Sequence, residues 1–203
     1  LPYLWKTLDY GETWDFIVDG IDTDDFTRVI RQDPKNPDVL YSGTERGVYI
    51  SFNQGSDWHS LSLNLPTVPV TGLIVEERDL VISTHGRSFW ILDDIETLRQ
   101  VDPSLEYSQD QLFKPSDAIR RTVPAVIDYH IENGNSEVSL EVLDSEGRHV
   151  TTLVERTNHS PGFYRKTWNL RYPGAVTFPG IVLEGGNPAN GPWAPPGIFL
   201  VRL

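Results

Sequence analysis

The sequence of 203 residues contains no cysteine, so disulfide bonds cannot stabilise its fold. This absence does not identify a compartment, because many exported bacterial proteins also lack cysteine. No segment approaches the roughly 18 consecutive apolar residues that a membrane-spanning helix requires, and no signal peptide is recognisable. Because the chain starts at Leu1 and not at methionine, we expect a mature form or a fragment of a longer chain.

Basic residues are scarce relative to acidic ones. The chain has 17 Lys and Arg against 29 Asp and Glu, which gives a formal net charge of −12 at pH 7. This charge repels phosphate groups, so it argues against nucleic acid and against an anionic membrane surface as partners, and we expect no membrane insertion. We interpret the charge as a well-solvated surface, and a cationic partner remains open.

Turn-forming residues are abundant instead. With 16 Gly, 15 Pro and 38% hydrophobic residues, the composition predicts an all-β chain that has many turns and enough apolar residues for a core. A length of 203 residues is typical of one or two domains.

One short pattern, Ser/Thr-x-Asp-x-Gly-x-x-Trp, occurs twice in the first 60 residues. The first copy matches it fully, and the second, 44 positions later, has Asn in place of Asp. A period of roughly 40–45 residues marked by Trp is typical of the four-stranded blades of a β-propeller. The fixed positions are Thr7, Asp9, Gly11 and Trp14 in the first copy and Ser51, Asn53, Gly55 and Trp58 in the second.

Each residue type in this pattern has a structural role. An apolar, β-prone segment precedes each copy and predicts the strand that enters a hairpin. The Asp or Asn can accept hydrogen bonds from backbone N–H groups of the turn, and the Gly can adopt a positive φ. The Trp begins the returning strand and can cover the turn with its ring. We therefore interpret the pattern as a turn and not as a catalytic motif.

The pattern resembles the Asp-box, or bacterial neuraminidase repeat, of sialidases, xyloglucanases and sortilin-type receptors. A third, degenerate copy supports the repeat, because residues 80–90 match residues 40–50 in phase and Asp93 follows where Asn53 stood. We predict that residues 1–97 are the C-terminal blades of a partial β-propeller, with about two Asp-box blades. The expected strands are 28–31, 39–42, 47–52, 72–76, 79–83 and 88–92.

Residues 98–124 carry few strand signals, and we interpret them as a connector with one helical turn near residues 95–101. Residues 125–203 predict an immunoglobulin-like (Ig-like) β-sandwich, with strands at 138–143, 150–154, 166–170 and 197–203. This segment resembles the Ig-like domain of flagellar hook-capping type. Because members of that family continue with another hairpin, it stays open whether the domain is incomplete at Leu203.

The two parts together resemble the C-terminal region of large exported bacterial proteins, described as sortilin-like or as glycosyl hydrolases with neuraminidase repeats. The resemblance implies export to the periplasm, the cell surface or the medium, and it implies no cofactor. A fold by itself is weak evidence for an activity.

Few residues are candidates for chemistry. His85 could act as a general base and Arg87 could bind an anion, although both also fit a hydrogen-bonded turn. Asp93 and Asp94 are adjacent carboxylates, but neighbouring residues of a strand point to opposite faces, and a retaining glycosidase needs two carboxyl groups about 5 Å apart. We expect structural roles for both.

The densest acidic cluster could supply oxygen ligands to Ca²⁺, but its spacing does not match an EF-hand loop, and we expect a solvated loop without a metal. The histidines at positions 130, 149 and 159 match no zinc spacing. The cluster consists of Asp19, Asp22, Asp24 and Asp25.

Two functional hypotheses remain. In the first, which we favour, the chain is a non-catalytic binding or assembly portion that docks onto a protein partner or onto the rest of its propeller. In the second, it is the C-terminal part of a glycoside hydrolase that acts on poly- or oligosaccharides, with the catalytic carboxylates largely outside this chain. A carboxylate pair in an aromatic-lined groove would favour the hydrolase.

Overall fold

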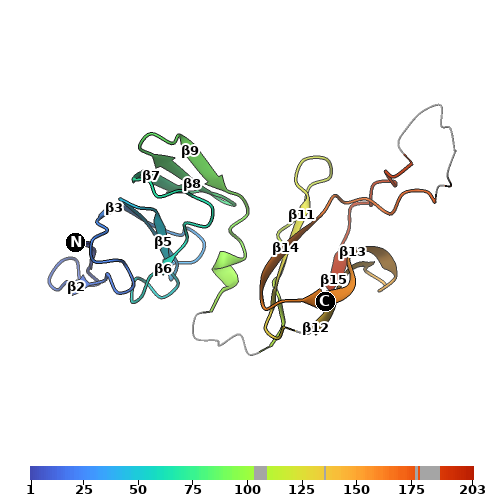
Figure 1. Cartoon of the computed structure of the whole chain (residues 1–203), viewed down its shortest axis with the longest axis horizontal. Helices are drawn as coiled ribbons and strands as arrows, with labels where there is room; N and C mark the ends of the chain where they lie inside the picture. Colours follow the sequence, from blue (N-terminus) through green and yellow to red (C-terminus); the bar gives the residue numbers. More distant parts are fainter. Residues whose placement is uncertain (103–108, 135, 177, 179–187) are drawn as a thin grey trace. The chain divides into compact units, whose positions relative to one another are not determined.

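The computed structural model describes residues 1–102, 109–134, 136–176, 178 and 188–203 (Figure 1). The chain divides into two units, Leu1–Leu105 and Glu106–Leu203. The regular elements are strands in small antiparallel sheets together with one short 3₁₀ helix, so the all-β prediction is confirmed. The described part of the chain contains no helix long and apolar enough to cross a membrane.

The N-terminal unit contains three antiparallel sheets, which we call the first, second and third sheets. Six of their strands overlap the six segments predicted from the sequence. The first sheet pairs β1 (Trp5–Lys6) with β2 (Asp15–Phe16); the second has the order β3 (Thr27–Gln32), β4 (Leu40–Thr44), β5 (Val48–Ser51), β6 (His59–Ser60); the third has the order β7 (Val70–Val75), β8 (Leu80–Thr84), β9 (Phe89–Leu92).

The first sheet repeats the outer hairpin of the second sheet. Trp5 pairs with Phe16 across β1 and β2, and Tyr49 pairs with Ser60 across β5 and β6. Tyr49 lies 44 positions after Trp5, and Ser60 lies 44 positions after Phe16. This is also the offset between the two sequence patterns. The sequence repeat is therefore also a repeat of strand register.

The third sheet repeats strands β3 to β5 of the second sheet, with one insertion. Gly43 pairs with Val48 in the second sheet, and Ser83 pairs with Phe89 in the third. The turn of the third sheet therefore has one residue more. As a result, the structural counterpart of Phe89 is Val48 and not Tyr49, as the sequence offset of 40 positions suggested.

Both faces of the central strands of the second sheet, β4 and β5, are buried. Successive side chains of a strand point to opposite faces, so Leu40 and Tyr49 join one core while Tyr41 and Ile50 join the other. The core shared with the first sheet contains Leu4, Ile17, Ile21, Leu40, Tyr49 and Trp58. The core shared with the third sheet contains Val39, Tyr41, Val48, Ile50, Val70, Leu73, Leu80, Ile82 and Ile95.

A buried ion pair fixes the segment after the third sheet. This segment contains the 3₁₀ helix η1 (Leu98–Gln100), which agrees with the helical turn predicted near residues 95–101. The Arg99 Nε donates to both carboxylate oxygens of Asp33 at 3.0 Å, and its Nη1 donates to the Glu77 carbonyl at 2.8 Å. Arg99 thereby connects the turn after β3 to the turn after β7.

The described residues of the C-terminal unit form two three-stranded antiparallel sheets. One has the order β10 (Gln111–Leu112), β11 (Ala125–Ile131), β14 (Gly162–Trp168), and the other has the order β13 (His149–His159), β12 (Ser136–Asp144), β15 (Phe199–Arg202). Their buried residues form a single cluster, which includes Tyr129, Leu140 and Trp168. Four strands overlap the predicted segments. The sequence predicted neither β10, which lies within the expected connector, nor β11.

Candidate functional site

In the first box, residues 7–14, the polar side chains bind the turn itself. The Thr7 Oγ1 accepts from the Gly11 N–H at 2.8 Å and donates to Asp9 Oδ1 at 2.9 Å. That Oδ1 also accepts from the Thr13 N–H at 2.9 Å, and Asp9 Oδ2 accepts from the Thr13 hydroxyl at 2.6 Å. Gly11 has φ +98°, which glycine adopts without strain. The side chains of Thr7, Asp9 and Thr13 therefore stabilise a single turn.

The second box, residues 51–58, repeats these bonds. The Ser51 Oγ accepts from the Gly55 N–H at 2.8 Å and donates to Asn53 Oδ1 at 2.9 Å. The same Oδ1 accepts from the Asp57 N–H at 3.1 Å. Asn53 also donates from Nδ2 to the Asp57 carboxylate, where the first box has a hydroxyl donating to a carboxylate. Asn therefore substitutes for Asp without changing the turn.

The two tryptophans of the boxes differ in what they contact. The Trp58 Nε1 donates to the backbone carbonyl of Ile17 at 3.0 Å, in the core between the first and second sheets. The Trp14 Nε1 donates within its own turn, to the Gly11 carbonyl at 3.2 Å. Trp58 is 2% exposed and Trp14 is 55% exposed. The second box thus joins two sheets, and the equivalent residue of the first box faces solvent.

Hydrogen bonds within the first box alter the acidity of its aspartate. The Thr13 hydroxyl, the Thr13 N–H and the Thr7 hydroxyl, in that order of effect, lower the pKa of Asp9 from 3.8 to about 2. Asp9 is only partly buried, and desolvation opposes this shift with a smaller effect. The carboxylate is ionised as a turn acceptor, and its low pKa makes it a poor general acid near neutral pH.

His85 and Arg87 lie in the turn between β8 and β9. The Thr84 Oγ1 donates to the Ser88 carbonyl at 2.7 Å, and the His85 N–H donates to the Pro69 carbonyl at 2.9 Å. Both candidate side chains are exposed. The Thr84 N–H also donates to the Ser88 carbonyl at 3.1 Å, and this bond closes the hairpin turn.

Asp93 and Asp94 follow β9 at its other end. Four strand residues at about 3.3 Å per residue separate them from the turn of His85, a distance of about 13 Å. Asp94 is buried and accepts from the Arg78 Nη2 at 2.8 Å, while Asp93 is exposed. The structure therefore does not bring these two pairs of candidates together.

The acidic cluster of residues 19–25 divides between structural and solvated side chains. Asp25 is buried, where it accepts from the Thr44 hydroxyl at 2.8 Å and from the Arg46 N–H at 3.1 Å. Asp24 forms an ion pair with Arg46 at 2.6 Å, and Asp19 and Asp22 are exposed. Among the residues that the structure describes, no group of three or more His, Asp or Glu could hold a metal ion.

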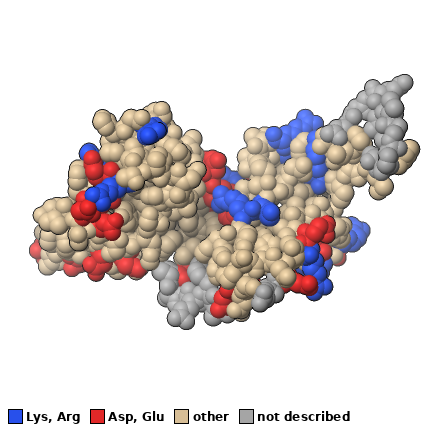
Figure 2. All heavy atoms as spheres, viewed as in Figure 1, with Lys and Arg blue, Asp and Glu red and all other residues tan. Residues whose placement is uncertain are grey.

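The charged surface is mixed. On the face drawn in Figure 2, acidic side chains lie beside basic ones at several places and do not form one continuous patch. The described residues include exposed ion pairs, such as Arg156 with Glu137 at 2.7 Å. This arrangement agrees with a solvated acidic surface.

Two exposed apolar faces stand out in the N-terminal unit, and the sequence analysis did not identify either. On the first sheet, the ring of Phe16 lies 4.8 Å from that of Trp5 and 6.4 Å from that of Tyr3, and all three side chains are exposed. On the third sheet, Ile74 and Ile91 flank Val81 in neighbouring strands, and both isoleucines are exposed. The period-2 alternation, read in the register of the repeat, could have revealed the face on the first sheet, whereas the face on the third sheet follows only from the strand pairing.

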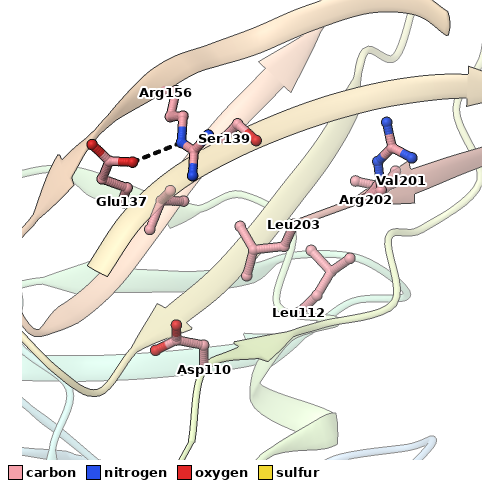
Figure 3. Close-up of a pocket in the computed structure, with 9 residues that line it drawn as sticks. Asp110, Leu112, Glu137, Ser139, Arg156, Val201, Arg202 and Leu203 are labelled. Carbon is pink, nitrogen blue, oxygen red and sulfur yellow. Dashed lines mark ion pairs between the residues drawn. The ribbon is translucent and has the colours of Figure 1, made fainter.

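The C-terminal unit has an open groove with a volume of about 820 Å³. Figure 3 shows Leu112 and Leu203 in the middle of the view, with charged residues around them. Glu137 and Arg156 at its rim form an ion pair with each other. Apolar and charged side chains both line this groove, and none of its described lining residues is aromatic.

Comparisons with known proteins identify no relative. No family model matches the sequence, and no curated protein and no solved structure matches it either.

Proposed function

We propose that this chain is a non-catalytic binding and assembly portion of an exported, sortilin-like Asp-box protein. Its N-terminal unit would be a set of propeller blades, and its C-terminal unit an Ig-like sandwich. The proposal includes a protein partner for the N-terminal unit and no role in turnover.

The bond from Trp58 to the Ile17 carbonyl supports this proposal more than any other observation. The side chains of Ser51 and Asn53 bind the turn of the box, and Trp58 binds the neighbouring sheet. Gln54 donates to Asp38 at 2.7 Å outside the box, so these polar groups form structural bonds. A Trp that docks into a neighbouring sheet is also typical of residues that contribute most to interfaces.

Among His85, Arg87, Asp93 and Asp94, only Asp93 offers an exposed carboxyl group. The turn of His85 and Arg87 lies about 13 Å along β9 from Asp93 and Asp94, and Asp94 is bound by Arg78. A retaining or an inverting glycosidase needs two carboxyl groups about 5–9.5 Å apart across one glycosidic bond. Asp93 and Asp94 are adjacent, but only Asp93 is exposed.

The two outer apolar faces support a protein partner. Exposed aromatic clusters rimmed by polar residues are typical of protein interfaces, and Trp and Tyr are enriched at their centres. Export rests on the resemblance of the sequence to exported Asp-box proteins.

A turnover assay tests the proposal. The purified chain is incubated with a β-glucan and with a sialyl-oligosaccharide, and released sugars are separated chromatographically. We expect no release above a heat-denatured control. Release that disappears in Asp93→Ala and persists in Asp110→Ala, a matched exposed carboxylate outside the N-terminal unit, would overturn the proposal in favour of the hydrolase.

A further inference from the structure

Asparagine directly precedes glycine at two places in the C-terminal unit, Asn133–Gly134 and Asn190–Gly191. In such a pair the side-chain amide can be lost spontaneously, because the backbone nitrogen of the glycine can attack the amide carbon of the asparagine. Glycine favours this reaction, since it has no side chain to hinder the approach and its backbone rotates freely. A backbone that the fold encloses cannot rotate in this way, and the two pairs differ in this respect.

The first pair lies in the connection between β11 and β12, where the structure leaves it accessible. Asn133 and Gly134 are both exposed. No described residue accepts a hydrogen bond from the Gly134 N–H, which is the group that must lose its proton. The Asn133 Nδ2 donates to the carboxylate of its neighbour Glu132 at 3.4 Å, which is a weak bond. The structure therefore does not hold the amide and the glycine nitrogen apart.

The second pair lies in a segment that backbone contacts enclose. The Tyr172 N–H donates to the Pro192 carbonyl, directly after the pair, at 2.9 Å. Gly191 is buried, and its carbonyl accepts from the Arg171 Nη1 at 2.7 Å. A Cβ added at Gly191 would lie 2.0 Å from the backbone oxygen of Tyr172. Because Asn190 itself is exposed, the enclosed backbone and not access to water distinguishes this pair from the first.

An Asp–Gly pair in the N-terminal unit is enclosed in the same way. Aspartate before glycine can form the same cyclic imide by losing water, and Asp19 precedes Gly20. The Asp19 carbonyl accepts from the Trp58 N–H at 2.8 Å, and a Cβ at Gly20 would lie 2.2 Å from the backbone oxygen of Trp58. These contacts hold the peptide group between Asp19 and Gly20 in place.

We propose that Asn133 is a site of spontaneous deamidation in the folded chain, whereas the fold protects Asn190 and Asp19. The Gly134 nitrogen gives its proton to a base in the solvent and bonds to the Asn133 Cγ. The Cγ–Nδ2 bond breaks, and the amide nitrogen leaves as ammonia. Water then opens the cyclic imide at either carbonyl carbon, which leaves aspartate or isoaspartate at position 133. This modification goes beyond the proposed binding role and does not depend on it.

The modification changes a loop that joins the two sheets of the C-terminal unit. It adds one negative charge to the net charge of −12, next to Glu132. The Glu132 N–H donates to Asp110 Oδ1 at 3.0 Å, so a second carboxylate lies close by. Isoaspartate also adds one methylene group to the main chain between β11 and β12, which belong to different sheets.

Peptide mapping by mass spectrometry tests this assignment on the full chain during incubation at mildly alkaline pH. Chromatography of the peptides separates aspartate from isoaspartate at each position. A parallel incubation in denaturant removes the protection that the fold gives. Asn133→Gln is the test variant, because the longer side chain of glutamine cyclises far more slowly, and Asn190→Gln is the matched control. Circular dichroism checks that both variants fold.

In the folded chain, Asn133 is expected to deamidate at least about tenfold faster than Asn190, because an enclosed residue reacts only through rare local opening. In denaturant the two rates are expected to become similar. The more acidic species in anion-exchange chromatography should accumulate in the Asn190→Gln variant as in the wild type, and should be largely absent from the Asn133→Gln variant.

Three results would overturn the proposal. The first is equal or slower loss of the amide at Asn133 than at Asn190 in the folded chain. The second is a difference between the two positions that persists in denaturant, which would assign it to the local sequence and not to the fold. The third is unchanged accumulation of the acidic species in Asn133→Gln.

Discussion

The indole N–H of Trp58 donates to the backbone carbonyl of Ile17 across the core between the first and second sheets. The residue 44 positions earlier, Trp14, has no neighbouring sheet on its side in the described chain and turns its indole N–H to its own turn. The same position of the repeat therefore connects two sheets in the second box and lies on an exposed surface in the first box.

This difference predicts that removing the two indole rings lowers the free energy of unfolding by unequal amounts. Trp58→Ala empties a buried site and leaves the Ile17 carbonyl without its donor, so we expect a loss of about 3–5 kcal/mol in the free energy of unfolding. Trp14→Ala, the matched control, removes a ring that is half exposed and should cost about 1 kcal/mol or less. Urea denaturation monitored by circular dichroism measures both. Equal losses for the two variants would contradict the different contacts of Trp58 and Trp14.

Gly20 tests how closely its segment packs against the backbone of Trp58. Gly20 and Gly86 have nearly the same φ, +92° and +89°, so alanine brings similar backbone strain at both, about 1 kcal/mol. An added Cβ at Gly20 would lie 2.2 Å from the backbone oxygen of Trp58, and at Gly86 it would meet nothing within 4 Å. We expect Gly20→Ala to destabilise the chain by about 1–3 kcal/mol more than Gly86→Ala in urea denaturation. A difference near zero would mean that the segments are not packed so closely.

The first box predicts an unusually acidic carboxyl group. Because the folded pKa of Asp9 is lowered to about 2, its stabilising contribution is fully present above the unfolded value of 3.8 and is lost as the pH falls through about 2. Carbon-13 NMR of the carboxyl group should give a midpoint near 2. Thr13→Val, which removes the hydroxyl donor, should raise the midpoint, and Thr23→Val outside the box should not. A midpoint of 3.8 in the unsubstituted chain would contradict the turn geometry.

The buried ion pair of Arg99 and Asp33 predicts that substituting Arg99, which lies outside both boxes, strongly lowers the free energy of unfolding. Their side chains are 4% and 0% exposed, so Arg99→Ala leaves a buried carboxylate without its partner and should cost about 3–5 kcal/mol. The exposed pair of Arg156 and Glu137 is the control, and Arg156→Ala should cost about 0–1 kcal/mol. Thermal and urea unfolding of both variants measure the difference, and a cost of Arg99→Ala below about 1 kcal/mol would contradict the buried pair.

The sequence located most strands because apolar runs alternate with turn residues, and the repeat added a fixed offset. It missed β11 because Asp128 lies in this buried strand, where Arg165 neutralises it through two bonds of 2.8 Å. A charge balanced by a distant partner interrupts the apolar pattern, and the partner's position cannot be read from spacing.

The outer face of the third sheet also escaped the sequence analysis, for a different reason. The turn of the third sheet holds one residue more than that of the second, so a constant offset aligns Phe89 with Tyr49, a residue of the opposite face. Only the strand pairing shows that Phe89 corresponds to Val48. The turn chemistry of both boxes, in contrast, was predictable, because it depends on residues within eight positions of each other.

Hydrogen exchange of the two indole N–H groups tests the central claim most directly. NMR of the chain reports each group separately. We predict that the indole N–H of Trp58 is strongly protected, while that of Trp14 exchanges rapidly. Rapid exchange of Trp58, or protection of Trp14 equal to that of Trp58, would contradict the account.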